Sequence, residues 1–167
     1  MILETQRLVL RIMCKEDVSS LQKSVFSDSE VMQYAFGGKV FSRDETKNFI
    51  ANNFAKENDK IGLAVLIHKD TKRLIGFAGL LKYEHFTPNS YEIGCVLAKD
   101  AWGNGYATEI GKAQIDYALN TLNAKNVYAF VNNDNRASLH VMEKLNFNYF
   151  NTMHIENRGV RTIFKWR

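Results

Sequence analysis

The chain has 167 residues, of which 46% are hydrophobic and 24% are charged. This length is typical of one globular domain, so we expect residues 1–167 to form a single domain with its own core. The single proline and the aromatic content of 12% argue against a disordered chain. The net charge of +4 is compatible with a polyanionic ligand. The Lys and Arg residues are scattered along the sequence, so we do not expect nucleic acid to be the main partner.

The two cysteines, Cys14 and Cys95, are too few for the disulfide framework of a small secreted domain. Cys95 lies in an apolar run, and we expect it to be a buried, reduced thiol. The N-terminal residues lack the long apolar stretch of a signal peptide, and no segment approaches the length of a membrane span. We therefore expect a cytoplasmic protein with no membrane partner.

The first third of the chain predicts a strand followed by two helices. Residues 5–13 alternate apolar and polar side chains, as in a half-buried strand. A short amphipathic helix begins near Asp17, and a second begins near Ser42, where Ser42 and Glu45 have the spacing of a capping box. The glycine-containing segment 34–41 between them is expected to be a loop.

Eight further elements follow these helices. Three strands separated by turn signals predict an antiparallel meander over 62–68, 73–83 and 91–97. A helix over 106–122 and a strand over 126–131 come next, and then a helix over 133–147 with Ala137, Val141 and Leu145 on its inner face. Two final strands cover 147–155 and 160–166.

This order of elements predicts an α+β fold. We expect a mixed, mostly antiparallel twisted sheet of about seven strands with helices on both faces. One strand–helix–strand crossover should bring strands 91–97 and 126–131 together in parallel, with the right-handed sense that such connections have.

The turn between the strand 91–97 and the helix 106–122 has the properties of an anion-binding site. The start of a helix presents unpaired backbone N–H groups and the positive end of the helix dipole. Gly103 and Gly105 let the chain tighten and let a phosphate approach the backbone. Such a turn can also be purely structural, and neither the three-glycine dinucleotide fingerprint nor a GKS or GKT motif is present.

The sequence AWGNGYATEI, which follows YEIGCVLAKD, resembles the acetyl-CoA motif of the GCN5-related N-acetyltransferases (GNAT). It is most similar to the branch that acetylates the N-termini of ribosomal proteins. Gly105 and Ala107 match the motif, whereas Trp102 stands where a Gln or Arg is usual. LETQRLVLR, SRDETKNFI and DNRASLHVMEKLNF resemble their counterparts in the same order, so the resemblance covers nearly the whole chain.

The resemblance implies acetyl-CoA as co-substrate and the GNAT fold. It implies that the strand 91–97 splays away from the strand 126–131, so that backbone groups near Val96 and Leu97 hold the pantetheine arm and polarise the acetyl carbonyl. Asn135 would also contact the pantetheine chain, or serve only as a helix N-cap. The pyrophosphate would bind the turn residues Trp102, Gly103, Asn104, Gly105, Tyr106, Ala107 and Thr108.

In this family an amine attacks the thioester directly within a ternary complex, which requires a base and an acid. Glu92 is the candidate base because it shares a strand face with Gly94 and Val96, although it could instead be an ion-paired strand glutamate. The usual acid position, a tyrosine seven residues after the asparagine, is occupied by Met142. In the branch that this sequence resembles, a serine stands three residues after the asparagine, so the resemblance makes Ser138 the candidate acid; it could instead be a first-turn serine bonded to the helix backbone.

The acceptor is a primary amine, either a protein or peptide N-terminus or a small molecule. Tyr34, Phe36, Tyr83 and His85 lie in the segments expected to form its pocket, where they could line an aromatic cleft or merely pack. No His and Cys residues stand at metal-ligand spacing, so no metal is expected. A non-catalytic acyl-CoA-binding module of the same fold is the alternative, and either a monomer or a homodimer is compatible with the sequence.

Overall fold

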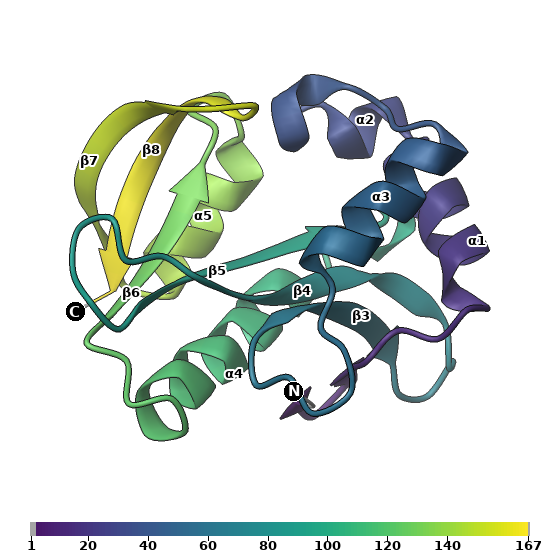
Figure 1. Cartoon of the computed structure of the whole chain (residues 1–167), viewed down its shortest axis with the longest axis horizontal. Coiled ribbons are helices and arrows are strands. Elements are labelled where there is room, and N and C mark those ends of the chain that lie inside the picture. Colours follow the sequence, from purple (N-terminus) through teal and green to yellow (C-terminus); the bar gives the residue numbers. More distant parts are fainter. Residues whose placement is uncertain (1–2, 167) are drawn as a thin grey trace.

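The computed structural model describes residues 3–166, which form one eight-stranded sheet with helices on both faces (Figure 1). The strand order is β1-β2-β3-β4-β5-β6-β8-β7, and all neighbouring pairs are antiparallel except β5 and β6. The strands are β1 (Leu3–Glu4), β2 (Leu8–Arg11), β3 (Gly62–His68), β4 (Leu74–Lys82), β5 (Ser90–Leu97), β6 (Asn126–Val131), β7 (Phe147–Ile155) and β8 (Gly159–Trp166). The predicted α+β class is confirmed, and β1 is the strand beyond the seven expected.

The helices agree with the expected segments apart from short additional turns. They are α1 (Asp17–Leu21), which continues as the π-helical turn η1 (Gln22–Phe26), α2 (Ser29–Met32), the 3₁₀ turns η2 (Phe36–Gly38) and η3 (Lys99–Ala101), α3 (Arg43–Asn53), α4 (Tyr106–Asn120) and α5 (Arg136–Lys144). The capping box of α3 is confirmed: Glu45 N–H donates to Ser42 Oγ over 3.3 Å, and Ser42 N–H donates to Glu45 Oε2 over 2.7 Å.

Two apolar cores lie on opposite faces of the sheet. One packs α4 and α5 against the sheet through residues such as Leu80, Ile93 and Ile110. The other lies under α1, η1 and α3 and is rich in phenylalanine, with the Phe26 and Phe77 rings stacked 5.4 Å apart. The two cores place helical layers above and below the central strands β4 and β5.

The helix α5 is rotated relative to the face that its sequence predicts. Met142 and Leu145 are buried, Val141 is half-buried, and Ala137 is exposed, so the expected position of Ala137 on the inner face is wrong. The first turn of α5 extends beyond the core to the wall of a cavity, to which Ala137 and Ser138 contribute. The helix therefore packs against the core through Leu139, Val141 and Met142, and Ala137 lies outside this contact.

The parallel pair β5–β6 is short, and its end creates the opening in the sheet. Pairing covers only Ser90, Tyr91 and Glu92 of β5, after which β6 continues alongside β8. The expected splay between these strands is thus confirmed. The buried Gln114 of α4 bonds to the sheet beside this opening: its Nε2 donates to the carbonyl of Gly94 over 3.0 Å and to that of Gly79 over 2.6 Å.

Candidate active site

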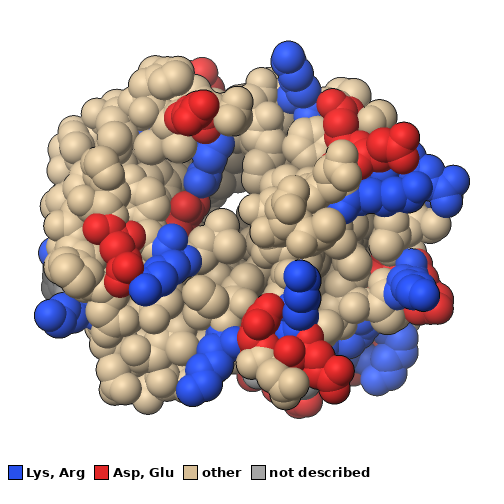
Figure 2. All heavy atoms as spheres, viewed as in Figure 1, with Lys and Arg blue, Asp and Glu red and all other residues tan. Residues whose placement is uncertain are grey.

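A cavity of about 1170 Å³ occupies the opening between β5 and β6 and reaches from α4 to the β7–β8 hairpin. Figure 2 shows the corresponding hollow near the middle of one face, with acidic and basic atoms at its edge. One wall is formed by the end of β5, the turn before α4 and the start of α5, with Trp102, Ala107, Asn132, Asn135, Ser138 and Val141. We call this the turn wall. The facing wall, which we call the arginine wall, includes Tyr34, Phe36, Phe77, Glu92, Arg158 and Arg161.

The turn before α4 has two glycines in the left-handed region, Gly103 at φ 75° and Gly105 at φ 78°. A Cβ on Gly103 would meet no atom within 4 Å, so the backbone angle and not crowding favours glycine there. Gly105 is the N-cap of α4, and no side chain caps the helix. The first N–H groups of α4 are therefore available to an anion beside Ala107, which lines the cavity.

Side chains hold this turn in place from both ends. The Trp102 indole is 46% exposed, and its Nε1 donates to the carbonyl of Leu97 over 2.9 Å. Asn104 Nδ2 donates to the carbonyls of Ala101 and Trp102. Trp102 and Asn104, which were predicted to bind the cofactor, thus fix the shape of the loop, and the carbonyl of Leu97 is engaged by the indole.

Glu109, in the first turn of α4, ties the turn to the start of the chain. Its carboxylate accepts hydrogen bonds from the Thr5 hydroxyl and from the Arg7 backbone and side chain, and Arg7 also donates to the Asn104 carbonyl. Burial acts to raise the pKa of Glu109, but the bonds from Thr5 and Arg7 together outweigh it and lower that pKa below the ordinary value. The Arg7 guanidinium also lies 4.7 Å from the centre of the Tyr106 ring.

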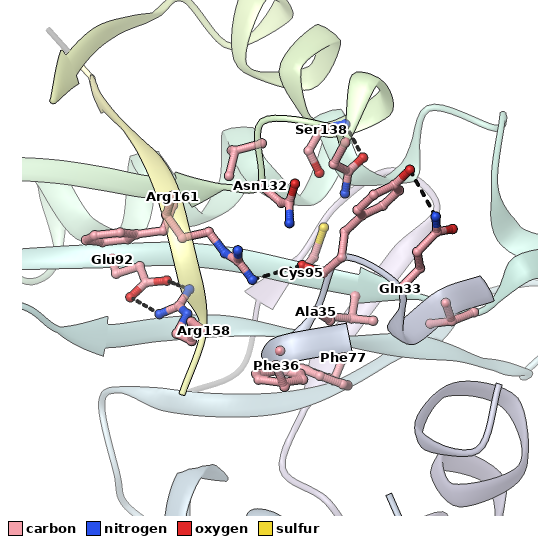
Figure 3. A pocket seen from close by; sticks show the side chains of 18 of the residues that line it. Gln33, Ala35, Phe36, Phe77, Glu92, Cys95, Asn132, Ser138, Arg158 and Arg161 are labelled. Carbon is pink, nitrogen blue, oxygen red and sulfur yellow. Dashed lines mark hydrogen bonds and ion pairs between the residues drawn. The ribbon is translucent and has the colours of Figure 1, made fainter. Parts of the chain in front are cut away.

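Glu92 lies in the cavity at the point where β5 leaves β6, paired with Arg158 (Figure 3). The two carboxylate oxygens accept from Arg158 at 2.6 Å and 3.0 Å, and the side chains are 11% and 29% exposed. The Arg158 guanidinium also lies 5.3 Å from the centre of the Phe130 ring. The ion-paired alternative for Glu92 is thus present in the structure, on the wall of the cavity where a base would act.

Asn135 and Ser138 lie together at the start of α5. Asn135 Oδ1 accepts from Ser138 N–H over 3.0 Å, so Asn135 is the N-cap of the helix. Within residues 3–166 the Ser138 hydroxyl makes no hydrogen bond to the protein, and Ser138 lines the cavity. Met142, one turn further along, is only 8% exposed and packs in the core.

The four predicted acceptor residues separate into two groups. Tyr34 and Phe36 line the cavity, where the Phe36 ring packs 4.6 Å from that of Phe49. Tyr83 and His85 are not among the residues that line it. Tyr83 instead packs in an aromatic cluster whose closest ring, that of Phe130, is 4.8 Å away.

The sequence analysis did not single out three polar residues of the cavity. Arg158 lies in the turn of the β7–β8 hairpin, which Asn157 (φ 60°) and Gly159 (φ 72°) allow, Arg161 lies in β8, and Asn132 follows β6. Arg158 is 66 positions from Glu92, so nothing in the local sequence reveals that the two residues form an ion pair. The sequence allows the segment 156–160 to be assigned to the pocket. It does not reveal which acidic residue Arg158 pairs with.

Cys95 is a free cysteine that lines the cavity; the residue as a whole is half-buried. Its apolar surroundings raise the pKa of the thiol to about 11, so it is a poor nucleophile at neutral pH. Across the described residues 3–166 no cluster of His, Cys, Asp and Glu could hold a metal ion. In the same part of the chain no helix is long and apolar enough to cross a membrane.

The parallel pair that splays over a glycine turn, with an uncapped helix start facing the gap, provides an anion-binding site beside an open strand, as the sequence resemblance to acetyl-CoA-dependent transferases implies. The sequence matches the family profile of the acetyltransferase (GNAT) domain over residues 7–148. It is 32% identical to the uncharacterized N-acetyltransferase YoaA of Bacillus subtilis over 149 residues, which cover 87% of this chain and 82% of that protein. The chain therefore belongs to the GNAT acetyltransferase family.

Solved structures agree with this assignment. An acetyltransferase of the GNAT family from Bacillus anthracis superposes with a TM-score of 0.82 at 25% identity, covering 99% of this chain and 96% of that one. The spermidine N-acetyltransferase from Vibrio cholerae, solved in complex with CoA and spermine, has a TM-score of 0.74 at 22% identity, with coverage of 95% and 93%. At that level of identity the second similarity concerns the fold alone.

Proposed function

We propose that the protein transfers the acetyl group of acetyl-CoA to a primary amine by direct attack in a ternary complex. The observation that carries this proposal is one cavity that contains both the uncapped start of α4 and the carboxylate of Glu92. The first can bind an anion and the second can accept a proton. An acyl thioester supplies an activated carbonyl, and the protein has to orient it beside a neutral amine.

The turn wall is proposed to hold the CoA. The N–H groups at the start of α4, with Gly103, Gly105, Tyr106, Ala107 and Thr108 around them, would accept the pyrophosphate. Backbone groups near Val96 and Leu97 would hold the pantetheine arm on the side of β5 that no longer pairs with β6, and Asn135 would contact it from α5. Trp102 and Asn104 would act through the shape of the loop, because their side chains already bond to the protein.

Glu92 is proposed to take the proton from the acceptor ammonium, directly or through a water molecule. Arg158 holds the carboxylate in place by its bidentate contact, and each carboxylate oxygen keeps a second lone pair for a further hydrogen bond. An α-amine with a pKa of about 7.7–8.0 is roughly a tenth neutral at pH 7, whereas a lysine amine is only about 0.04% neutral. An α-amine therefore needs less help from the base.

Ser138 is proposed to protonate the departing thiolate or a water beside it. Its hydroxyl is free of protein partners, and the N-cap bond of Asn135 fixes the residue at the edge of the cavity. Met142 cannot supply the proton because it lies in the core. The narrower assignment to enzymes that acetylate ribosomal-protein N-termini stays a prediction from the sequence resemblance.

The test is release of free thiol from acetyl-CoA across a panel of α-amines, lysine peptides, polyamines and amino acids. We expect turnover with at least one acceptor and a product carrying one acetyl group on nitrogen, detected by mass spectrometry. If CoA binds but no amine is acetylated, the protein is instead a non-catalytic acyl-CoA-binding module. The same panel decides between a peptide N-terminus and a small molecule as acceptor.

A further inference from the structure

Arg161, in β8, places inside the cavity a positive charge that forms no ion pair of its own within the described residues. The residue is only 4% exposed, and it lines both the main cavity and the adjoining one of about 480 Å³. None of the ion pairs formed within residues 3–166 includes it. Figure 3 shows its guanidinium extending into the space between Glu92 and Ser138.

The hydrogen bonds of Arg161 leave much of its guanidinium available. Nη1 donates to the carbonyl of the adjacent Val160 over 2.9 Å, and Nη2 donates to that of Tyr34 over 3.3 Å. A guanidinium has five N–H donors and does not lose its proton in proteins, so three donors and the whole charge remain. Burial, together with the nearby Arg158, lowers the pKa of Arg161 from its ordinary value, and the attraction of Glu92, which is already paired with Arg158, offsets this only in part.

The charge balance of the cavity interior points to the sign of the missing partner. Only Glu92, Arg158 and Arg161 are charged groups that are not exposed, and Glu92 is already paired with Arg158. The other charged residues of the lining are exposed, namely Glu30, Lys39 and Glu156. The interior therefore has one positive charge in excess, which disfavours a polycationic acceptor and favours one that brings an anion.

We propose that the acceptor is a small amino carboxylic acid, an amino acid or short peptide, whose carboxylate pairs with Arg161 while its amine faces Glu92. This inference rests on the proposed acetyl transfer and narrows its acceptor. The planar guanidinium matches a carboxylate through two parallel N–H···O bonds. The rings of Tyr34, Phe36 and Phe77 on the same wall offer an apolar surface to the rest of the molecule.

The test compares acceptors that share an amine but differ in the carboxylate. Amino acids and dipeptides are assayed with acetyl-CoA as free acids and as their C-terminal amides. We expect the kcat/KM of the best acid to exceed that of its amide at least about tenfold, because the amide cannot form the charge-assisted pair. Equal values for acid and amide would overturn the inference and leave the proposed acetyl transfer standing.

Substitutions of Arg161 and of an exposed arginine show whether the preference for acids depends on Arg161 itself. Arg161→Gln should bring the acid-to-amide ratio to about one by slowing the acid alone, and Arg161→Lys should retain only part of the preference because it keeps the charge without the fork. Arg43→Gln removes an exposed arginine at the start of α3 and should leave the ratio unchanged. A ratio in Arg161→Gln equal to that of the unaltered protein would contradict the proposal.

Binding without turnover makes the test independent of catalysis. Calorimetry with N-acetylated amino acids and their amides, in the presence of CoA, should give tighter binding of the acids, and Arg161→Gln should remove that difference. This result supports the anion site even if no amine is acetylated, and equal binding in the unaltered protein overturns it. A loss of CoA affinity in Arg161→Gln larger than the loss for the acids would assign Arg161 to the CoA and also overturn it.

The unfolding temperature of Arg161→Gln tests whether Arg161 has only a structural role. A buried cation without a partner destabilises the fold, so Arg161→Gln should unfold at the same temperature as the unaltered protein or at a higher one. A clear fall in that temperature with an unchanged acid-to-amide ratio would mean that Arg161 serves only to hold the Tyr34 carbonyl. That outcome would overturn the proposal.

Discussion

The two walls of the cavity are assembled in opposite ways. The part of the turn wall that we propose to hold the pyrophosphate comes from one stretch of chain between β5 and α4, and backbone groups shape it. The arginine wall brings together Tyr34, Glu92, Arg158 and Arg161 from three distant segments, and their side chains determine its character. The contrast suggests that the shared co-substrate is bound by local backbone geometry and that the acceptor is selected by tertiary contacts.

The most severe change to the turn wall is Gly105→Trp. The left-handed φ of 78° strains any other residue, and an indole at the N-cap would fill the space before the α4 N–H groups. We expect the Kd for CoA, measured by calorimetry, to rise at least about a hundredfold, which corresponds to about 2.7 kcal/mol. Gly105→Ala is the matched control because it has the same strain without the bulk. Normal CoA affinity in a folded Gly105→Trp would contradict the anion site.

On the arginine wall the largest effect is expected for Glu92→Gln. Loss of a general base lowers turnover by about 10²–10⁴-fold, and the defect should shrink as the pH rises, because the acceptor amine is then neutral without help. The measurement is kcat/KM against pH. Arg158→Gln is the control, since it breaks the same ion pair, at a similar cost in stability of about 1–3 kcal/mol, and keeps the carboxylate. Equal losses of turnover in both variants would leave Glu92 with a structural role only.

The same contrast explains how much the sequence could predict. Ser42 with Glu45, and Gly105 before α4, are signals contained within a few residues, and the strands 62–68 and 126–131 have the predicted limits. α2 escaped prediction because it has four residues, although Asp28 caps it. Such short elements are stabilised by their tertiary surroundings more than by local preference.

The features that the sequence did not predict, the buried face of α5 and the partner of Glu92, share one physical cause. The rotation of α5, which buries Met142 and exposes Ala137, depends on how the helix meets the sheet. The pairing of Glu92 with Arg158 depends on the path of the β7–β8 hairpin. Apolar periodicity gives the type of an element and its buried side only approximately, and side chains far apart in the sequence meet only once the sheet is assembled. The glycine turn before α4 was therefore predictable in detail, and the arginine wall only as a set of segments.

Ser138→Ala tests the part of the turn wall that belongs to α5. We expect kcat to fall about tenfold, less than the roughly 10²–10⁴-fold typical of acid–base groups because a water beside the thiolate can replace the hydroxyl, with the Kd for CoA unchanged. Stability should not change, because the Ser138 hydroxyl has no protein partner within residues 3–166 and the N-cap bond uses the backbone N–H. Turnover and unfolding temperature are measured on the same preparation. A fall in stability with normal turnover would make Ser138 a structural residue.

Glu109→Gln tests how the turn wall is fixed, through the pH dependence of stability. The folded-state pKa of Glu109 is lowered, so its contribution is present above the unfolded value of about 4.3 and is lost as the pH falls through the lower folded value. At pH 7 we expect the variant to be less stable by about 1 kcal/mol, or about 3 °C in Tm. The difference should shrink below pH 4 in calorimetric scans. A difference that does not change with pH would show that packing, not charge, ties Arg7 to α4.

The smallest effect concerns Cys95, which lies between the two walls. With a pKa of about 11, roughly one thiol in 3,000 is ionised at pH 7.5, and no base contacts it among the described residues. After incubation with acetyl-CoA and no acceptor, intact-mass measurement should therefore find no acetyl group on Cys95, and rapid mixing should give no burst of free thiol. A stoichiometric adduct on Cys95, followed by its transfer to an added amine, would replace direct attack with a covalent route. In that case the amine would meet the acetyl group on the protein, and the two substrates would no longer need to occupy the cavity at the same time.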